Sequence, residues 1–162
     1  MPPLTDAEFN ALETAGSQVL LVFPEIPGAC VMMSALYVGR LHDLGHRSAR
    51  LVGGALSIGS HVVFGRTATA APFTQTDLDW DGHAWVRFGD RLADVSLVRT
   101  AYSAEAPAVL ATHMTRLRRP DQPRYIATPE AAGEEGLTYA EQHVFSKKQV
   151  NQLYLSALTF LP

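Results

Sequence analysis

The sequence has only one cysteine, no long apolar run and no surplus of basic residues. A single cysteine, Cys30, excludes an internal disulfide and fits a reducing compartment. The first residues lack the basic and apolar regions of a secretory signal, and no apolar stretch approaches the ~20 residues of a membrane span. A net charge of -3 argues against nucleic-acid binding, which normally needs a basic face. We therefore expect a soluble cytoplasmic protein with neither a membrane nor a nucleic-acid partner.

The composition is that of a chain that can bury a core. Its 162 residues are 47% hydrophobic and 18% charged, which is typical of a globular domain. This length suits a single domain over residues 1–162 rather than two domains. We expect residues 100–162 to be a helical C-terminal part of that domain, with one helix over residues 105–117.

Capping boxes predict where two helices begin, because each pairs a hydroxyl residue with a glutamate or glutamine three positions later. The first box opens at Thr5 and predicts a short helix that ends at Gly16, followed by a strand or an extended run over residues 19–23. The second opens at Ser146 and predicts a C-terminal amphipathic helix. Residues 30–44 are apolar on nearly all sides at their start, as expected of a buried central helix.

Strand patterns occupy the middle of the chain. Residues 50–58 and 61–64 are expected to form strands, and the paired glycines at 53–54 suggest a bulge or a close backbone approach. Residues 83–88 and 91–97 flank a Gly-Asp turn and are expected to form a hairpin.

The hairpin brings two polar side chains together. A two-residue loop at 89–90 pairs Phe88 with Arg91 and fixes the register of the remaining positions. Because side chains alternate between the two faces of a sheet, His83 and Asp94 become diagonal neighbours on one face. We therefore expect a hydrogen bond between them.

Cys30 follows a loop over residues 23–29 that proline and glycine interrupt, and it opens the predicted central helix. The positive end of the helix dipole favours a thiolate there, and the first-turn N–H groups can donate to a developing oxyanion. His83 is then the candidate base that takes the thiol proton, and Asp94 the acid that orients His83. This chemistry needs no cofactor and no metal.

Several segments resemble the transglutaminase-like branch of the papain-like cysteine enzymes. They are Gly-Ala-Cys at 28–30, Gly-His-Ala-Trp-Val at 82–86, Leu-Ala-Asp at 92–94 and the glycine-ended run at 45–54, within roughly residues 18–98. The resemblance implies an α+β fold in which the cysteine helix packs on an antiparallel sheet. It also implies a nucleophilic cysteine, a histidine base and an orienting aspartate at the three positions already singled out.

Candidate substrate-binding residues lie around these elements. Papain has a glutamine six residues before its cysteine, where this chain has Pro24, so Gln18 is the candidate oxyanion donor further back. Trp80, in an acidic surface loop, is a candidate for lining a substrate groove. Trp85 fits either such a groove or packing beside the triad.

The function that these features predict is a cysteine-dependent hydrolase or acyl transferase acting on an amide bond. The resemblance makes a peptide or protein the expected substrate and a thioester the expected intermediate, as in a thiol protease or a transglutaminase. The alternative is a non-catalytic binding or adaptor domain that retains a papain-like shell. It draws on the C-terminal third, which resembles no family that we recognise and ends in an amphipathic helix.

A histidine pair offers a competing metal site. His42 and His46 have the i, i+4 spacing of zinc ligands on a helix, but Asp43 stands where the zinc-peptidase motif needs a glutamate. Gly45 is expected to end the helix between them, which would turn the two rings apart. We therefore expect a solvated helix end rather than a metal site.

Overall fold

The chain folds into helices packed on an antiparallel sheet, so the α+β class expected from the sequence is confirmed. The computed structural model describes residues 1–26, 28–65, 81–117 and 123–162. The helices are α1 (Asp6–Val22), α2 (Cys30–Asp43), α3 (Leu97–Ala101), α4 (Ala108–Leu117), α5 (Pro129–Glu134) and α6 (Lys147–Leu158). The strands are β1 (Arg50–Ile58), β2 (His61–Phe64), β3 (His83–Phe88), β4 (Arg91–Asp94), β5 (Tyr125–Ala127) and β6 (Leu137–Val144).

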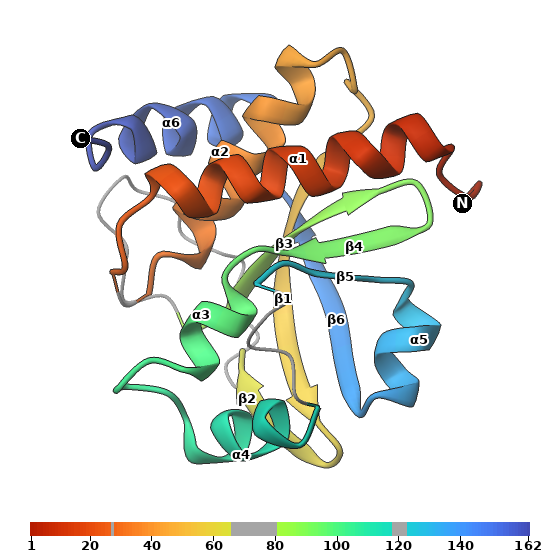
Figure 1. Ribbon diagram of the computed structural model, residues 1–162, viewed down its shortest axis with the longest axis vertical. Helices are drawn as coiled ribbons and strands as arrows, with labels where there is room; N and C mark the ends of the chain where they lie inside the picture. Colours follow the sequence, from red (N-terminus) through yellow and green to blue (C-terminus); the bar gives the residue numbers. More distant parts are fainter. Residues whose placement is uncertain (27, 66–80, 118–122) are drawn as a thin grey trace.

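The described strands form one sheet in the order β2-β1-β3-β4-β5, with β6 also paired to β1. Every pairing is antiparallel, and β1 is central because it pairs with β2, β3 and β6. Figure 1 shows β1 and β6 running side by side through the middle of the molecule. Strand β4 joins β3 to β5 and so places the predicted hairpin inside the sheet.

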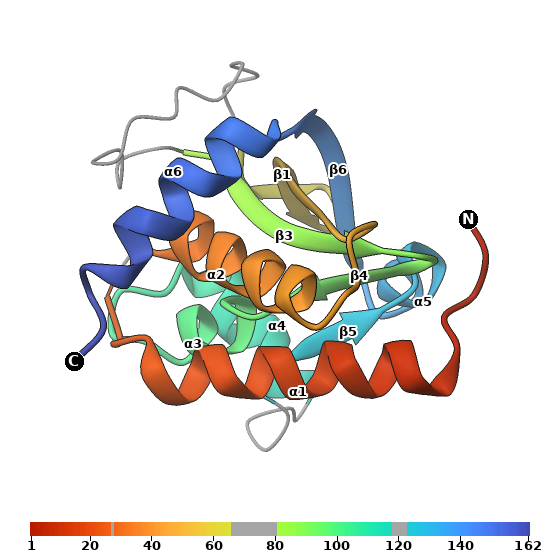
Figure 2. The same ribbon diagram turned by 90° about the horizontal axis from the view of Figure 1, so that it is seen from above.

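Each face of the sheet has its own apolar core, because successive strand residues point to opposite faces. Val86 and Ala93 belong to the core shared with α1, α2 and α6, whereas Trp85 and Leu92 belong to the core shared with α3, α4 and α5. Figure 2 shows α2 lying between α1 and α6 above the sheet. The expected packing of the cysteine helix on an antiparallel sheet is therefore confirmed.

Helix α1 is longer than its sequence predicts, and the expectations of a stop at Gly16 and a strand over residues 19–23 are wrong. The helix continues through Gly16 to Val22. A Cβ at position 16 would lie 2.9 Å from the hydroxyl oxygen of Tyr37 on α2. Here glycine allows two helices to approach closely, and that reason for a glycine cannot be told from a helix end in the sequence alone.

The glycine pair in β1 marks a bulge, as expected. The register between β1 and β6 shifts between Gly53 and Gly54, and a Cβ on Gly54 would lie 1.9 Å from the carbonyl oxygen of Ala140. Beyond the bulge Leu56 pairs with Tyr139. The irregularity therefore sets which residues of β6 face the core that contains Trp85.

The C-terminal part, residues 100–162, is helical only in part. It supplies α4, α5 and α6, but also β5 and the eight-residue β6 that completes the sheet. Most β6 residues are exposed or half-exposed, and the sequence Leu137–Val144 shows no clean alternation of apolar and polar residues. Such alternation is the usual sign of a strand, so the sequence pattern did not predict β6. The capping box at Ser146 opens α6 as predicted.

None of the helices in the described ranges has the length and apolar character that crossing a bilayer requires.

Candidate active site

The hairpin forms with the predicted register and brings His83 and Asp94 together. Phe88 pairs with Arg91 and Val86 pairs with Ala93. The Nε2 atom of His83 lies 2.5 Å from Oδ2 of Asp94, so a short hydrogen bond joins the two side chains. Only 2% of His83 and 1% of Asp94 is exposed. The expected contact between His83 and Asp94 is therefore present and shielded from water.

Cys30 is the first residue of α2, and its side chain lies near enough to His83 to contribute to the raised pKa of that histidine. Because Nε2 of His83 is occupied by Asp94, Nδ1 is the ring nitrogen left for the thiol. The first backbone hydrogen bond at this end of α2 runs from Met33 N–H to Ala29 C=O. The N–H groups before Met33 have no acceptor within the helix and are suited to bind an oxyanion.

Burial and charge act in opposite directions on His83. Burial disfavours the imidazolium and lowers its pKa, but the charge of Asp94, the hydrogen bond to Asp94 and the nearby Cys30 together outweigh that effect and raise the pKa to about 10. The imidazolium is therefore the favoured form at neutral pH. The structure thus places a cation next to the Cys30 side chain.

Asp94 is held by hydrogen bonds on both of its oxygens. Oδ1 accepts from the backbone N–H of Ser96 at 3.1 Å, from the Ser96 hydroxyl at 3.1 Å and from Leu97 N–H at 3.0 Å. Oδ2 accepts from His83 and, at 2.9 Å, from the hydroxyl of Tyr139. With five donors around it, this carboxylate is a fixed anion that holds the ring of His83 in place.

Sequence reasoning missed two aromatic residues that contact this pair. Phe64 at the end of β2 stacks on the His83 ring with centroids 5.1 Å apart and an interplanar angle of 14°. Tyr139 reaches Asp94 from β6. Each lies far from the hairpin in the sequence, and each depends on a strand pairing with β1 that local patterns do not predict.

Arg99 fastens the loop that leads to Cys30. From α3 its guanidinium donates to the carbonyl oxygens of Leu20 at 2.9 Å, Phe23 at 2.8 Å and Pro24 at 3.3 Å. The last turn of α1 has no basic residue of its own, so Arg99 supplies the cation that the end of the helix dipole favours. Because α3 starts beside Asp94, the same short helix connects Asp94 to the loop before Cys30.

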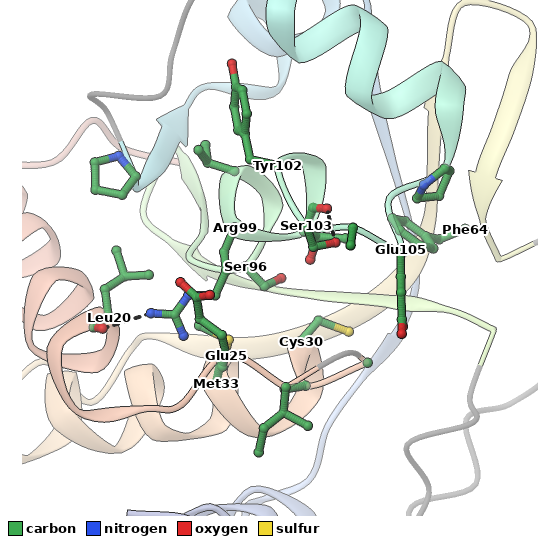
Figure 3. A pocket seen from close by; sticks show the side chains of 18 residues that line it. Leu20, Glu25, Cys30, Met33, Phe64, Ser96, Arg99, Tyr102, Ser103 and Glu105 are labelled. Atoms are coloured by element: carbon green, nitrogen blue, oxygen red, sulfur yellow. Dashed lines mark hydrogen bonds between the residues drawn. The ribbon is translucent and has the colours of Figure 1, made fainter.

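A cavity of about 870 Å³ opens beside the Cys30 side chain. This volume falls in the range of small-ligand sites. Figure 3 shows its labelled lining residues coming from α1, α2, α3, β2, the turn between β4 and α3, and the loops after α1 and α3, namely Leu20, Glu25, Cys30, Met33, Phe64, Ser96, Arg99, Tyr102, Ser103 and Glu105. Of Cys30, His83 and Asp94, only Cys30 borders this cavity.

The three candidate substrate-binding residues have different outcomes. Trp80 lies outside the described residues. Trp85 is 3% exposed and packs edge-on against Tyr139 at 5.0 Å, so it supports the triad from the core. Gln18 accepts hydrogen bonds from Arg40, ten residues after Cys30 on α2 and so about 15 Å along the helix. The structure therefore brings neither Gln18 nor Trp85 to the cavity.

The histidine pair near the end of α2 is engaged in other contacts. Nε2 of His42 lies 2.9 Å from the carbonyl oxygen of Ala49, and the ring of His46 packs on Phe88 at 5.4 Å. In the part of the chain that the structure describes, no group of three or more histidine, cysteine or acidic residues is placed to hold a metal ion.

Comparison with known proteins adds no relative to this picture. No protein-family model, no curated protein and no solved structure matches the chain.

Proposed function

We propose that this protein is a cysteine-dependent acyl-transfer enzyme of the papain-like, transglutaminase-like kind, acting on an amide bond of a peptide or protein. The observation that supports this most is the chain of contacts from Cys30 to His83 to Asp94, with the thiol beside a cavity and the aspartate buried. Nucleophile, base and orienting acid stand in the order that thiol catalysis requires.

In the first half-reaction the sulfur of Cys30 attacks the substrate carbonyl carbon. A carbon–sulfur bond forms while Nδ1 of His83 holds the former thiol proton, and the N–H groups at the start of α2 stabilise the oxyanion. The carbon–nitrogen bond then breaks, and His83 gives its proton to the leaving amine. The product is a thioester on Cys30.

In the second half-reaction water or an amine attacks the thioester. His83 takes a proton from the attacking group, and the carbon–sulfur bond breaks. The sulfur leaves as the thiolate paired with the imidazolium, which restores the starting state. Hydrolysis and transfer to an amine differ only in which acceptor enters the cavity.

The decisive experiment is alkylation of Cys30 by iodoacetamide, followed by mass spectrometry across pH. We expect wild-type Cys30 to react at pH 6–7 at least about tenfold faster than free cysteine, because the thiolate fraction sets the rate. His83→Ala should abolish this advantage. His113→Ala is the matched control, since His113 contacts the carbonyl oxygen of Glu135 and not Cys30.

Substrate turnover requires a separate measurement. A peptide pool incubated with the enzyme should give cleaved or amine-modified products, and a thioester adduct on Cys30 should appear after rapid acid quenching. Reactivity no higher than that of free cysteine, together with no effect of His83→Ala, would falsify the proposal.

A further inference from the structure

We infer that Tyr139 is a positioning residue of this site, which shares the Oδ2 oxygen of Asp94 with His83 and limits how strongly that oxygen binds the imidazole. The inference rests on the proposed function for its catalytic meaning. It assigns a role to β6, a strand of the C-terminal third that the triad itself does not use.

The geometry starts from one shared atom. The Tyr139 hydroxyl donates to Oδ2 of Asp94 at 2.9 Å, and Nε2 of His83 lies 2.5 Å from the same oxygen. Because Oδ1 is already occupied by Ser96 and Leu97, the carboxylate cannot rotate to give each donor its own oxygen. The two donors therefore compete for the negative charge on Oδ2.

The surroundings keep the Tyr139 hydroxyl a donor. Burial and then the charge of Asp94 raise the pKa of Tyr139 above its usual range, so the hydroxyl stays protonated at neutral pH. The titratable groups that face it are His83 on β3, Asp94 on β4, Tyr125 on β5 and Glu135 after α5, and Cys30 on α2 faces His83. Of these, Asp94 is the group to which the hydroxyl donates.

The position of Tyr139 is set by backbone structure. Leu56 of β1 pairs with Tyr139 just beyond the Gly53–Gly54 bulge, which turns Tyr139 toward the core shared with Trp85. The Trp85 ring meets the tyrosine ring edge-on at 5.0 Å, and Tyr125 stacks on it at 6.4 Å. The ring is therefore held on both sides with its hydroxyl aimed at Asp94.

The test reads the hydrogen bond between His83 and Asp94 directly. The Nε2–H proton of His83, assigned by its absence in His83→Gln, is followed by NMR at neutral pH. In Tyr139→Phe, Oδ2 loses one donor and binds His83 more strongly, so the resonance should move downfield. Site-specific 3,5-difluorotyrosine at position 139 strengthens the competing donor, so the resonance should move upfield.

Tyr125→Phe is the matched control, because Tyr125 is a buried neighbour whose hydroxyl donates to Glu135 at 3.2 Å and not to Asp94. It should leave the His83 resonance unchanged. Opposite shifts for the two Tyr139 variants cannot arise from a packing role alone. An unchanged resonance in folded difluorotyrosine protein overturns the inference, even if Tyr139→Phe fails to fold. Shifts of the expected signs with an unreactive Cys30 would keep this inference and reject the enzyme.

Discussion

The two ends of the triad differ sharply in their surroundings. Asp94 is 1% exposed and receives hydrogen bonds from the chain on both oxygens. Cys30 is half-buried and borders the cavity. The buried end at Asp94, called the closed end below, fixes the orientation and charge of His83. The end at Cys30, called the open end, leaves room for a substrate. Changes at the closed end should therefore affect stability and reactivity together, and changes near the open end should affect mainly reactivity.

The largest effect is expected from Asp94→Asn, which keeps the shape of the side chain but removes its charge. The imidazolium of His83 loses its counter-ion, and acyl transfer should fall by roughly three to four orders of magnitude. The amide N–H₂ must also face donors such as Ser96 N–H or Tyr139 O–H, so unfolding should become easier by about 3–5 kcal/mol. The rate of thioester formation on Cys30, followed by rapid acid quenching, and urea unfolding measure the two effects.

The control for this variant is Asp90→Asn in the same hairpin. Asp90 accepts from Leu4 N–H at 3.2 Å and pairs with Arg91 at the turn, away from His83. It should lose less than about 1 kcal/mol of stability and no reactivity at Cys30. Equal losses of stability and reactivity in Asp94→Asn and Asp90→Asn would show that the contacts of Asp94 with His83 have no special effect. That outcome would contradict the role given to the closed end.

The closed end should also give stability a defined pH dependence. Because the pKa of His83 is raised from 6.5 to about 10 in the folded state, its contribution is complete below pH 6.5 and is lost as pH rises through about 10. The loss should be on the order of a few kcal/mol. Urea unfolding of Cys30→Ala, in which no thiol titrates, should show this decline above pH 6.5 and complete it below pH 10, because Cys30 supplies part of the rise in the pKa of His83.

Adding His83→Gln to the Cys30→Ala background should flatten this pH profile, because the titrating ring is gone. A stability curve that rises with pH up to about 6.5 and is flat above that value would show that burial rather than Asp94 governs His83. In that case His83 would be neutral beside Asp94 at neutral pH, and the closed end would hold no fixed cation.

The parts of the site predicted from the sequence are those set by local rules. A two-residue loop dictates the register of β3 and β4, so the His83–Asp94 contact followed from counting residues. The start of α2 at Cys30 followed from an apolar run after a loop interrupted by proline and glycine. Each of these depends on residues that are near neighbours in the chain.

The parts that were missed depend on contacts between distant segments. Tyr139 reaches Asp94 only because β6 pairs with β1 across a bulge, and Gly16 lies within a helix only because α2 packs against it. Nothing in the sequence singles out Arg99, yet it donates to carbonyls 75 or more positions away. Sequence periodicity holds no information about such pairings.

A smaller effect is expected from Arg99→Lys, which tests how the loop before Cys30 is held. A lysine keeps the charge but cannot match the guanidinium in bonding three carbonyls at once. Stability should fall by about 1–2 kcal/mol, and alkylation of Cys30 should slow several-fold as the loop loosens. The matched control is Arg40→Lys. Arg40 lies at the far end of α2 and its partner is Gln18 on α1, so this variant should change neither stability nor the alkylation rate of Cys30. Unaltered alkylation in Arg99→Lys would show that α2 alone positions the thiol.

The smallest effect is expected from Gln18→Ala, which asks whether the oxyanion donor comes from the backbone or from a side chain. Gln18 meets Arg40 at 3.1 Å on an exposed surface, so its loss should change stability by no more than about 0.5 kcal/mol. Thioester formation should keep its wild-type rate, because the N–H groups at the start of α2 are already placed at Cys30. A tenfold slower acylation would instead mean that α1 contributes to the open end of the site, and the oxyanion would need a second donor.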